Sequence, residues 1–203
     1  KTEIVSIGIG NWINKKIKNR YIHPKDWDKF IKESNLKLLD VRNTYETTIG
    51  KFNFSINPNT SSFREFPNKF KELGIKKEDK IAMYCTGGIR CEKASLFLRS
   101  EGYKNVFQLE GGILNYLEYK KQKSNCWQGE CFVFDKRVSI NHNLDQGNYL
   151  QCYGCRRPIT KGMTNSYKYK KGVHCPLCFL ERSEEQKANS LMRQKQIEMK
   201  NFR

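Results

Sequence analysis

The sequence predicts an α/β protein, in which a parallel β-sheet flanked by helices is followed by a small cysteine-rich, zinc-binding-like domain. Short apolar segments alternate with helical segments between residues 20 and 122. Beyond them this periodicity stops, and two Cys-x2-Cys pairs fall between residues 152 and 178. We expect four parts: a strand and linker left from an absent N-terminal domain (1–19), the α/β domain (20–122), the cysteine-rich domain (123–182) and a basic, partly ordered helical tail (183–203).

Each element of the α/β domain follows from a local pattern. Pro24 suits a first helical position, and Trp27, Phe30 and Ile31 then fall on one face of an amphipathic helix. Residues 36–41 form an apolar run that ends in polar residues, as expected of a buried parallel strand. The remaining predictions are a strand at 1–7, a helix at 63–73 that Pro67 breaks or starts, a strand at 80–84, a helix at 89–100 ended by Gly102, a strand at 105–109 and a helix at 113–122.

The net charge, the apolar runs and the cysteine content of the chain indicate its kind of partner and its cellular compartment. A formal net charge of +17 over 203 residues favours a polyanion, with nucleic acid first; a diffuse lysine excess that only solvates the surface is the alternative. No apolar run approaches the ~20 residues of a membrane span. Since most of the eight cysteines do not read as a disulfide framework, we expect a cytoplasmic protein without membrane contact.

The loop that begins at Cys85 carries the strongest chemical signal. Cys85 stands where the strand at 80–84 ends and a glycine-rich turn enters a helix. Gly87 and Gly88 allow consecutive N–H groups to point at the sulfur, and these donors favour a thiolate. Arg90 adds a cation beside the nucleophile. We predict Cys85 and Arg90 as catalytic residues; a buried structural cysteine is the less favoured alternative. The predicted active-site loop comprises Thr86, Gly87, Gly88 and Ile89.

Several motifs between residues 20 and 122 resemble the rhodanese superfamily, whose order they follow. They are Asp40-Val41-Arg42, Tyr45-Glu46, Gly50, Ile56-Asn57, the Cys85 loop and Glu110-Gly111-Gly112-Ile113. The resemblance implies a rhodanese-like parallel sheet and adds Asp40 and Arg42 to the predicted site. Four residues separate Cys85 from Arg90, which favours a persulfide sulfur over the phosphate taken by related phosphatases with a longer loop. Cys91 is a candidate resolving thiol or a buried helix residue.

The cysteine-rich domain is predicted to bind a metal. Cys152 and Cys155 are separated from Cys175 and Cys178 by nineteen residues, a spacing that places four thiolates around one structural Zn²⁺. Metal binding would also supply folding energy to a segment with few apolar residues. Disulfides are the alternative. The roles of three further residues stay open. Cys126 and Cys131 form a second pair or are packed thiols. His174 replaces a metal ligand or, as the favoured alternative, lies at the surface.

Basic and aromatic residues interleave in the same domain, a mixture that holds phosphates and stacks bases in single-stranded RNA recognition. A solvated hairpin is the alternative. The predicted RNA-binding residues are Arg156, Arg157, Lys168, Lys170 and Lys171, which lie beside Tyr149, Tyr153, Tyr167 and Tyr169.

Longer stretches, at residues 56–67, 84–94 and 127–135, resemble the tRNA uridine hydroxylase family over about residues 1–178. The resemblance implies an oxidoreductase that hydroxylates the wobble uridine of tRNA to 5-hydroxyuridine, with molecular oxygen as co-substrate and Cys85 as the active cysteine. Family members also carry an N-terminal ferredoxin-like domain, so the chain is expected to be a fragment.

Two alternative functions stay open: a sulfurtransferase that carries a persulfide on Cys85, and a non-catalytic scaffold that binds zinc and RNA. The three histidines, His23, His142 and His174, form no recognisable facial iron triad. Our mechanistic hypothesis is therefore that the Cys85 thiolate adds to C6 of uracil and makes C5 electron-rich, while Arg90 or a loop N–H steadies the enolate.

Overall fold

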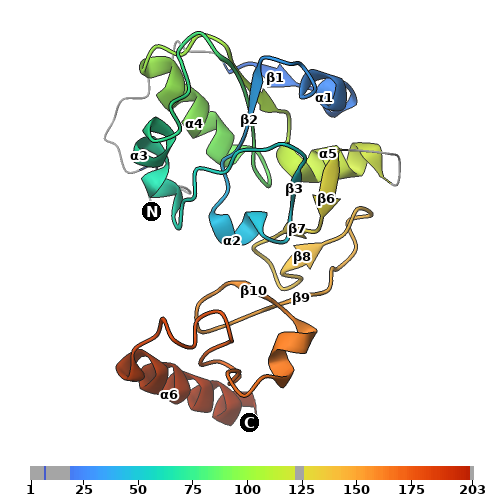
Figure 1. Cartoon of the computed structure of the whole chain (residues 1–203). Helices are drawn as coiled ribbons and strands as arrows, with labels where there is room; N and C mark the ends of the chain where they lie inside the picture. Colours follow the sequence, from blue (N-terminus) through green and yellow to red (C-terminus); the bar gives the residue numbers. More distant parts are fainter. Residues whose placement is uncertain (1–6, 8–18, 122–125, 202–203) are drawn as a thin grey trace. The chain divides into compact units, whose positions relative to one another are not determined.

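The computed structural model (Figure 1) describes residues 7, 19–121 and 126–201. The chain divides into two compact units, unit 1 with residues 1–132 and 141–145 and unit 2 with residues 133–140 and 146–203. Unit 1 thus continues past residue 122, where the sequence pattern suggested that the α/β domain ends. The strand expected at 1–7 lies outside the described residues except for Ile7, which is buried in the core of unit 1.

Unit 1 is built on a four-stranded parallel sheet with the strand order β1-β5-β4-β2. The strands are β1 (Tyr21–Ile22), β2 (Leu36–Asp40), β4 (Lys80–Tyr84) and β5 (Val106–Leu109). β4 lies between β2 and β5 and all five of its residues pair with β2, so the end of β4 is held on both sides. The predicted α/β class is confirmed, and Cys85 follows directly on a central strand.

Helices accompany this sheet in the expected order (Figure 1): α1 (Pro24–Phe30), α2 (Thr44–Thr47), α3 (Phe66–Lys71), α4 (Ile89–Ser100) and α5 (Gly112–Lys120). α1 packs with α5 and α3 packs with α4. The helix expected over 63–73 is divided, because a 3-10 turn at Phe63–Glu65 precedes α3. Pro67 lies in the first turn of α3, where its missing N–H leaves no helical hydrogen bond unmade.

A short antiparallel pair joins the chain beyond residue 125 to unit 1. β3 (Gly50–Phe52) pairs with β6 (Trp127–Gly129), with Phe52 opposite Trp127. The Phe52 ring lies edge-on to Tyr84, Tyr116 and Trp127, with ring centroids 4.8 to 5.1 Å apart. The sequence pattern grouped residues 127–132 with the cysteine-rich domain. These residues, which include β7 (Cys131–Phe132), instead complete the aromatic core of unit 1.

Unit 2 contains β8 (Ser139–Ile140), the antiparallel pair β9 (Tyr149–Gln151) and β10 (Pro158–Thr160), a 3-10 turn at Lys161–Asn165 and the helix α6 (Glu184–Asn201). The tail was expected to be partly ordered, and α6 instead forms 18 helical residues. Arg182 donates to the carbonyl of Gly154 at 2.6 Å, and Arg193 donates to the carbonyl of Tyr153 at 3.0 Å. These arginines fix α6 to a cysteine-bearing loop. No described helix combines the length and the apolar character of a membrane span.

Candidate active site and metal centre

The Cys85 loop is shaped by two glycines on neighbouring helices. Gly88 precedes α4 with φ +91°, a left-handed conformation, and its N–H donates to the Cys85 sulfur over 3.1 Å. At Gly112, which opens α5, a Cβ would lie 2.6 Å from the carbonyl oxygens of Cys85 and Thr86. This close approach lets the amide of Ile113 donate to the Cys85 carbonyl at 3.0 Å. The carbonyls of the loop are thus bound to α5, and an N–H faces the sulfur, as the sequence predicts.

The surroundings of Cys85 favour its thiolate. A hydrogen bond from the Cys91 thiol and the charge of Arg90 lower the pKa of Cys85 to about 6, against the opposing effect of burial. Burial and the neighbouring Cys85 raise the pKa of Cys91 well above its ordinary value, so Cys91 stays protonated and acts as the donor. The two thiols are therefore in contact, and Cys91 is a buried residue of α4, whereas a resolving role for Cys91 stays a prediction. Cys85 is only 2% exposed, although Gly87 and Ile89 bring the outer side of the loop to the surface.

Arg90 forms an ion pair with Glu46, a residue that the sequence analysis did not predict as part of the site. Its guanidinium makes a two-pronged ion pair with Glu46, at 2.5 and 2.8 Å, and both side chains are buried. The Thr86 hydroxyl lies 3.4 Å from the same guanidinium and 3.5 Å from the carbonyl of Phe132 in β7. Glu46 therefore orients Arg90 beside the loop. The only sequence signal for it was the Tyr45-Glu46 motif.

Asp40 and Arg42 are both fully buried and pair with each other. Arg42 donates through Nε to Asp40 at 2.8 Å and through Nη2 to the carbonyl of Gly50 at 2.7 Å. Its guanidinium also lies 5.2 Å from the centre of the Trp127 ring. In this geometry the pair ties the end of β2 to β3, and neither side chain faces solvent where a substrate would bind.

These features define a class: an α/β domain with an anionic cysteine at the tip of a central parallel strand, in a loop of main-chain donors beside a buried arginine. The model of the rhodanese-like domain family matches residues 23–119. Residues 23–119 are therefore a rhodanese-like domain, and this domain supports a rhodanese-type cysteine chemistry, either sulfur transfer or a related reaction.

Parts of the chain are similar to several solved structures. A rhodanese-related protein from Thermoplasma volcanium shares 32% identity over 49% of this chain and 92% of that chain, with a TM-score of 0.42. The rhodanese-like domain of an Anabaena protein shares 17% identity over 56% of this chain and 80% of that chain, with a TM-score of 0.45. An EanB variant in complex with ergothioneine, covalently linked with a cysteine persulfide, shares 18% identity over 46% of this chain and 24% of that chain, with a TM-score of 0.39.

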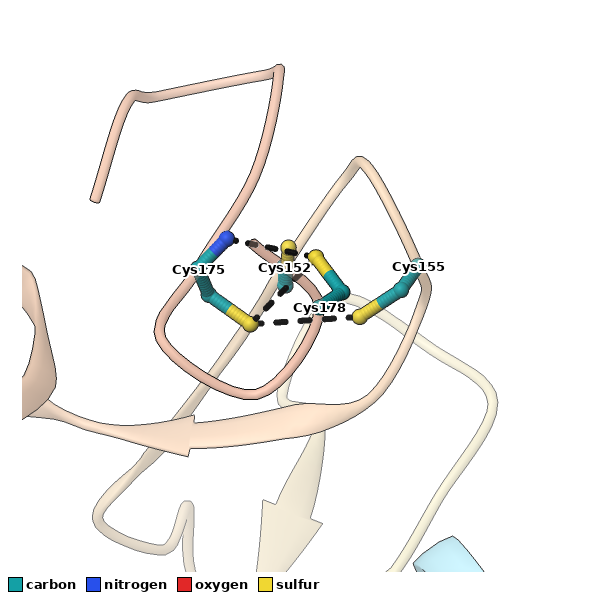
Figure 2. Close-up of side chains that lie close together, drawn as sticks. All are labelled: Cys152, Cys155, Cys175 and Cys178. Atoms are coloured by element: carbon teal, nitrogen blue, oxygen red, sulfur yellow. Dashed lines mark hydrogen bonds between the residues drawn. The ribbon is translucent and has the colours of Figure 1, made fainter. Parts of the chain in front are cut away.

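The four cysteines predicted to bind metal come together in unit 2 (Figure 2). Their sulfur atoms all lie within 4.8 Å of one another, and Cys175 lies 3.9 Å from Cys155 and 3.8 Å from Cys178. Four sulfurs about 2.3 Å from a tetrahedral zinc ion would be about 3.8 Å apart, whereas a disulfide needs about 2.05 Å. The amide of Cys175 also donates to the Cys178 sulfur at 3.3 Å. The cluster therefore fits a zinc ion and does not form disulfides.

The three residues left open in this region are now placed. His174 points its Nδ1 at the carbonyl of Lys168, 2.8 Å away, and does not belong to the metal-binding group. Cys126 and Cys131 are free thiols rather than a disulfide pair. Cys131 is fully buried in unit 1, and this burial raises the pKa of its thiol to about 12.

The predicted RNA-binding residues lie in unit 2 but differ in what they contact. Arg157 pairs with Glu181 and donates to the carbonyl of Leu177, at 3.2 Å, so it joins the two cysteine-bearing loops. Arg156 is exposed and lies 5.8 Å from the centre of the Tyr153 ring. Lys168 is half-buried, whereas Lys170 and Lys171 are exposed.

Proposed function

We propose that the chain is a tRNA-modifying enzyme that hydroxylates the wobble uridine to 5-hydroxyuridine, with Cys85 as its nucleophile. The position of the Cys85 sulfur is the observation that carries the proposal: it accepts a hydrogen bond from the Gly88 amide at 3.1 Å, at the tip of β4 and in the same loop as the buried Arg90. The substrate and the use of molecular oxygen come from the resemblance of residues 56–67, 84–94 and 127–135 to tRNA uridine hydroxylases.

The proposed reaction begins when the Cys85 thiolate adds to C6 of the uracil ring, which places electron density on C5 and on the O4 enolate. The enriched C5 then takes one oxygen atom from molecular oxygen. The second oxygen atom leaves as water, and a thiol reductant from solution supplies the two electrons and two protons as two of its thiols are oxidised to a disulfide. Loss of the C5 proton and departure of the thiolate restore the C5–C6 double bond. Because Glu46 holds Arg90 at 2.5 Å, the loop amides are better suited than Arg90 to steady the enolate.

Sulfur transfer is the second candidate, and the burial of Cys85 favours it. A cysteine with 2% exposure cannot receive a whole uracil ring unless the loop at Gly87 and Ile89 moves, whereas a single sulfur atom needs less space. In this reaction the thiolate attacks the outer sulfur of a donor such as thiosulfate. A Cys85 persulfide forms and sulfite leaves with the electron pair of the broken S–S bond.

The test measures 5-hydroxyuridine in tRNA from cells that produce either the wild-type chain or Cys85→Ala in place of their own enzyme. We expect the modified nucleoside with the wild type and its loss with Cys85→Ala. Cys126→Ala is the matched control, because Cys126 is a half-buried free thiol of the same unit. Unchanged 5-hydroxyuridine with Cys85→Ala would refute the enzymatic proposal and leave a zinc- and RNA-binding scaffold. Incubation with 5-fluorouridine tRNA should trap an adduct on Cys85; a Cys85 persulfide without such an adduct would indicate sulfur transfer instead.

A further inference from the structure

One residue beside the metal centre has an unfavourable backbone conformation. Arg156 follows the last cysteine of the first Cys-x2-Cys pair and has φ +67°. Its amide donates to the carbonyl of Cys152 at 2.7 Å, which closes the loop around the metal ligands. Glycine would adopt this left-handed conformation without the clash that a Cβ brings. Arginine is thus less suited to this turn than glycine, which directs attention to its side chain.

The Arg156 side chain is exposed beside an exposed aromatic ring. Its guanidinium lies 5.8 Å from the centre of the Tyr153 ring, and Tyr153 is 53% exposed. Strained backbone that surrounding structure holds in place is typical of functional positions. The strain here presents a cation and a π-face together, on a loop that the metal ligands fix.

A second group of the same kind flanks the other cysteine pair. Tyr167 is 85% exposed, and the Lys168 ammonium lies 5.5 Å from the centre of its ring. Tyr167 also lies edge-on to Phe179, the residue after Cys178, with 6.3 Å between ring centroids. The Lys187 ammonium is 4.7 Å from the centre of the Phe179 ring. Each cysteine pair of the metal centre thus carries an exposed aromatic residue with a cation beside it.

The charge of unit 2 identifies the kind of molecule that suits these rings. Its sequence holds fourteen Lys and Arg residues against five Asp and Glu, an excess of nine positive charges. Exposed aromatic rings stack on unpaired bases, and neighbouring cations hold the phosphates between those bases. In a paired duplex the bases are already stacked and offer no free face to the rings.

We propose that the two aromatic–cation pairs of unit 2, Tyr153 with Arg156 and Tyr167 with Lys168, form the surface that binds unpaired nucleotides of RNA by stacking and phosphate contact. The inference deepens the proposed function, because it names the surface that would engage the RNA substrate, but it does not depend on the reaction at Cys85. Arg157 is left outside this surface, since Glu181 and the carbonyl of Leu177 already engage it.

The experiment measures fluorescence anisotropy of the zinc-loaded full chain with a labelled single-stranded RNA of about twelve nucleotides. We expect Tyr153→Leu and Tyr167→Leu each to weaken binding about tenfold. Arg156→Gly is the decisive variant: it should weaken binding about fivefold and lower the salt slope by about one, while the melting temperature stays equal or rises. If Arg156 had only a structural role, its replacement by glycine would not weaken RNA binding in a protein that is as stable as the wild type or more stable.

Arg137→Ala is the matched control, because Arg137 is an exposed arginine of the same unit that pairs with Asp135 at 2.7 Å. The proposal would be overturned if Arg156→Gly and Tyr153→Leu bound RNA as the wild type does, or if polyglutamate displaced RNA at equal charge concentration, which would indicate an acidic protein partner. Equal affinity for a double-stranded RNA would likewise contradict stacking. Cys85→Ala should bind RNA normally, so loss of 5-hydroxyuridine and loss of RNA binding are separate outcomes.

Discussion

The state of the Cys85 sulfur can be tested through its pH dependence. Its pKa of about 6 lies three units below the ordinary value of 9.0. At pH 7 about 90% of the sulfur would therefore be thiolate, compared with about 1% of an ordinary cysteine. Nucleophilicity falls with pKa, by about twentyfold over three units, so the net gain in reactivity at pH 7 is only about fourfold. The midpoint of the reactivity profile is thus a sharper measure than the rate.

The assay follows alkylation of Cys85 by iodoacetamide between pH 4 and 10, with the modified peptide quantified by mass spectrometry. Burial slows the absolute rate but leaves the midpoint unchanged, provided that access to the sulfur does not vary with pH. We expect a wild-type midpoint at about 6. Cys91→Ala removes the hydrogen bond that lowers this pKa most, so the midpoint should rise, whereas Cys91→Ser keeps a donor and should shift it less.

A wild-type midpoint above about 8, near that of a free thiol, would refute the reasoning about the loop. A wild-type midpoint at about 6 that stays unchanged in Cys91→Ala would refute the role of Cys91 alone and leave the loop amides as the cause.

Three further predictions concern the ion pair, the metal and the pH dependence of stability. Glu46→Ala leaves the Arg90 guanidinium buried without its partner, and should lower the free energy of unfolding by about 3 to 5 kcal/mol in urea titrations; an unchanged midpoint would contradict the burial of this pair. Mass spectrometry of the native chain should find one zinc ion, retained in Cys126→Ser and lost in Cys175→Ser; zinc bound equally by both variants would exclude the four-cysteine site. Because the folded-state pKa of Cys85 is lowered, its contribution to stability is present above about pH 9 and is lost as the pH falls through about 6. The difference in unfolding free energy between wild type and Cys85→Ser should therefore decrease over that window, by at most about 1.4 kcal/mol per pH unit. A difference that grows at low pH would contradict the lowered pKa.

Local patterns were sufficient for the elements that shape the loop. The strand at 80–84 and the helix at 89–100 have the predicted bounds, because an apolar run and a glycine-rich helix start are local signals. The four clustered cysteines were predicted for a similar reason, since the spacing of their two pairs reflects the geometry of a metal ion.

Contacts between distant residues left no such pattern. The pairing of Phe52 with Trp127 joins segments 75 positions apart, and each strand is only three residues long, too short to show periodicity. The ion pair between Glu46 and Arg90 was missed because the two residues are 44 positions apart, and the Tyr45-Glu46 motif does not indicate which residue Glu46 contacts. The helix α6 was underestimated because Arg182 and Arg193 hold it through backbone carbonyls, which every residue offers and no sequence motif marks.

The Thr86 hydroxyl contacts the carbonyl of Phe132, and Phe132 is the last residue of unit 1 before the chain first enters unit 2. The backbone at the end of β7 is thus in direct contact with the nucleophile loop. The same Thr86 hydroxyl lies 3.4 Å from the Arg90 guanidinium, so a substitution that displaces the Phe132 carbonyl should be felt at Arg90 through this single hydroxyl group.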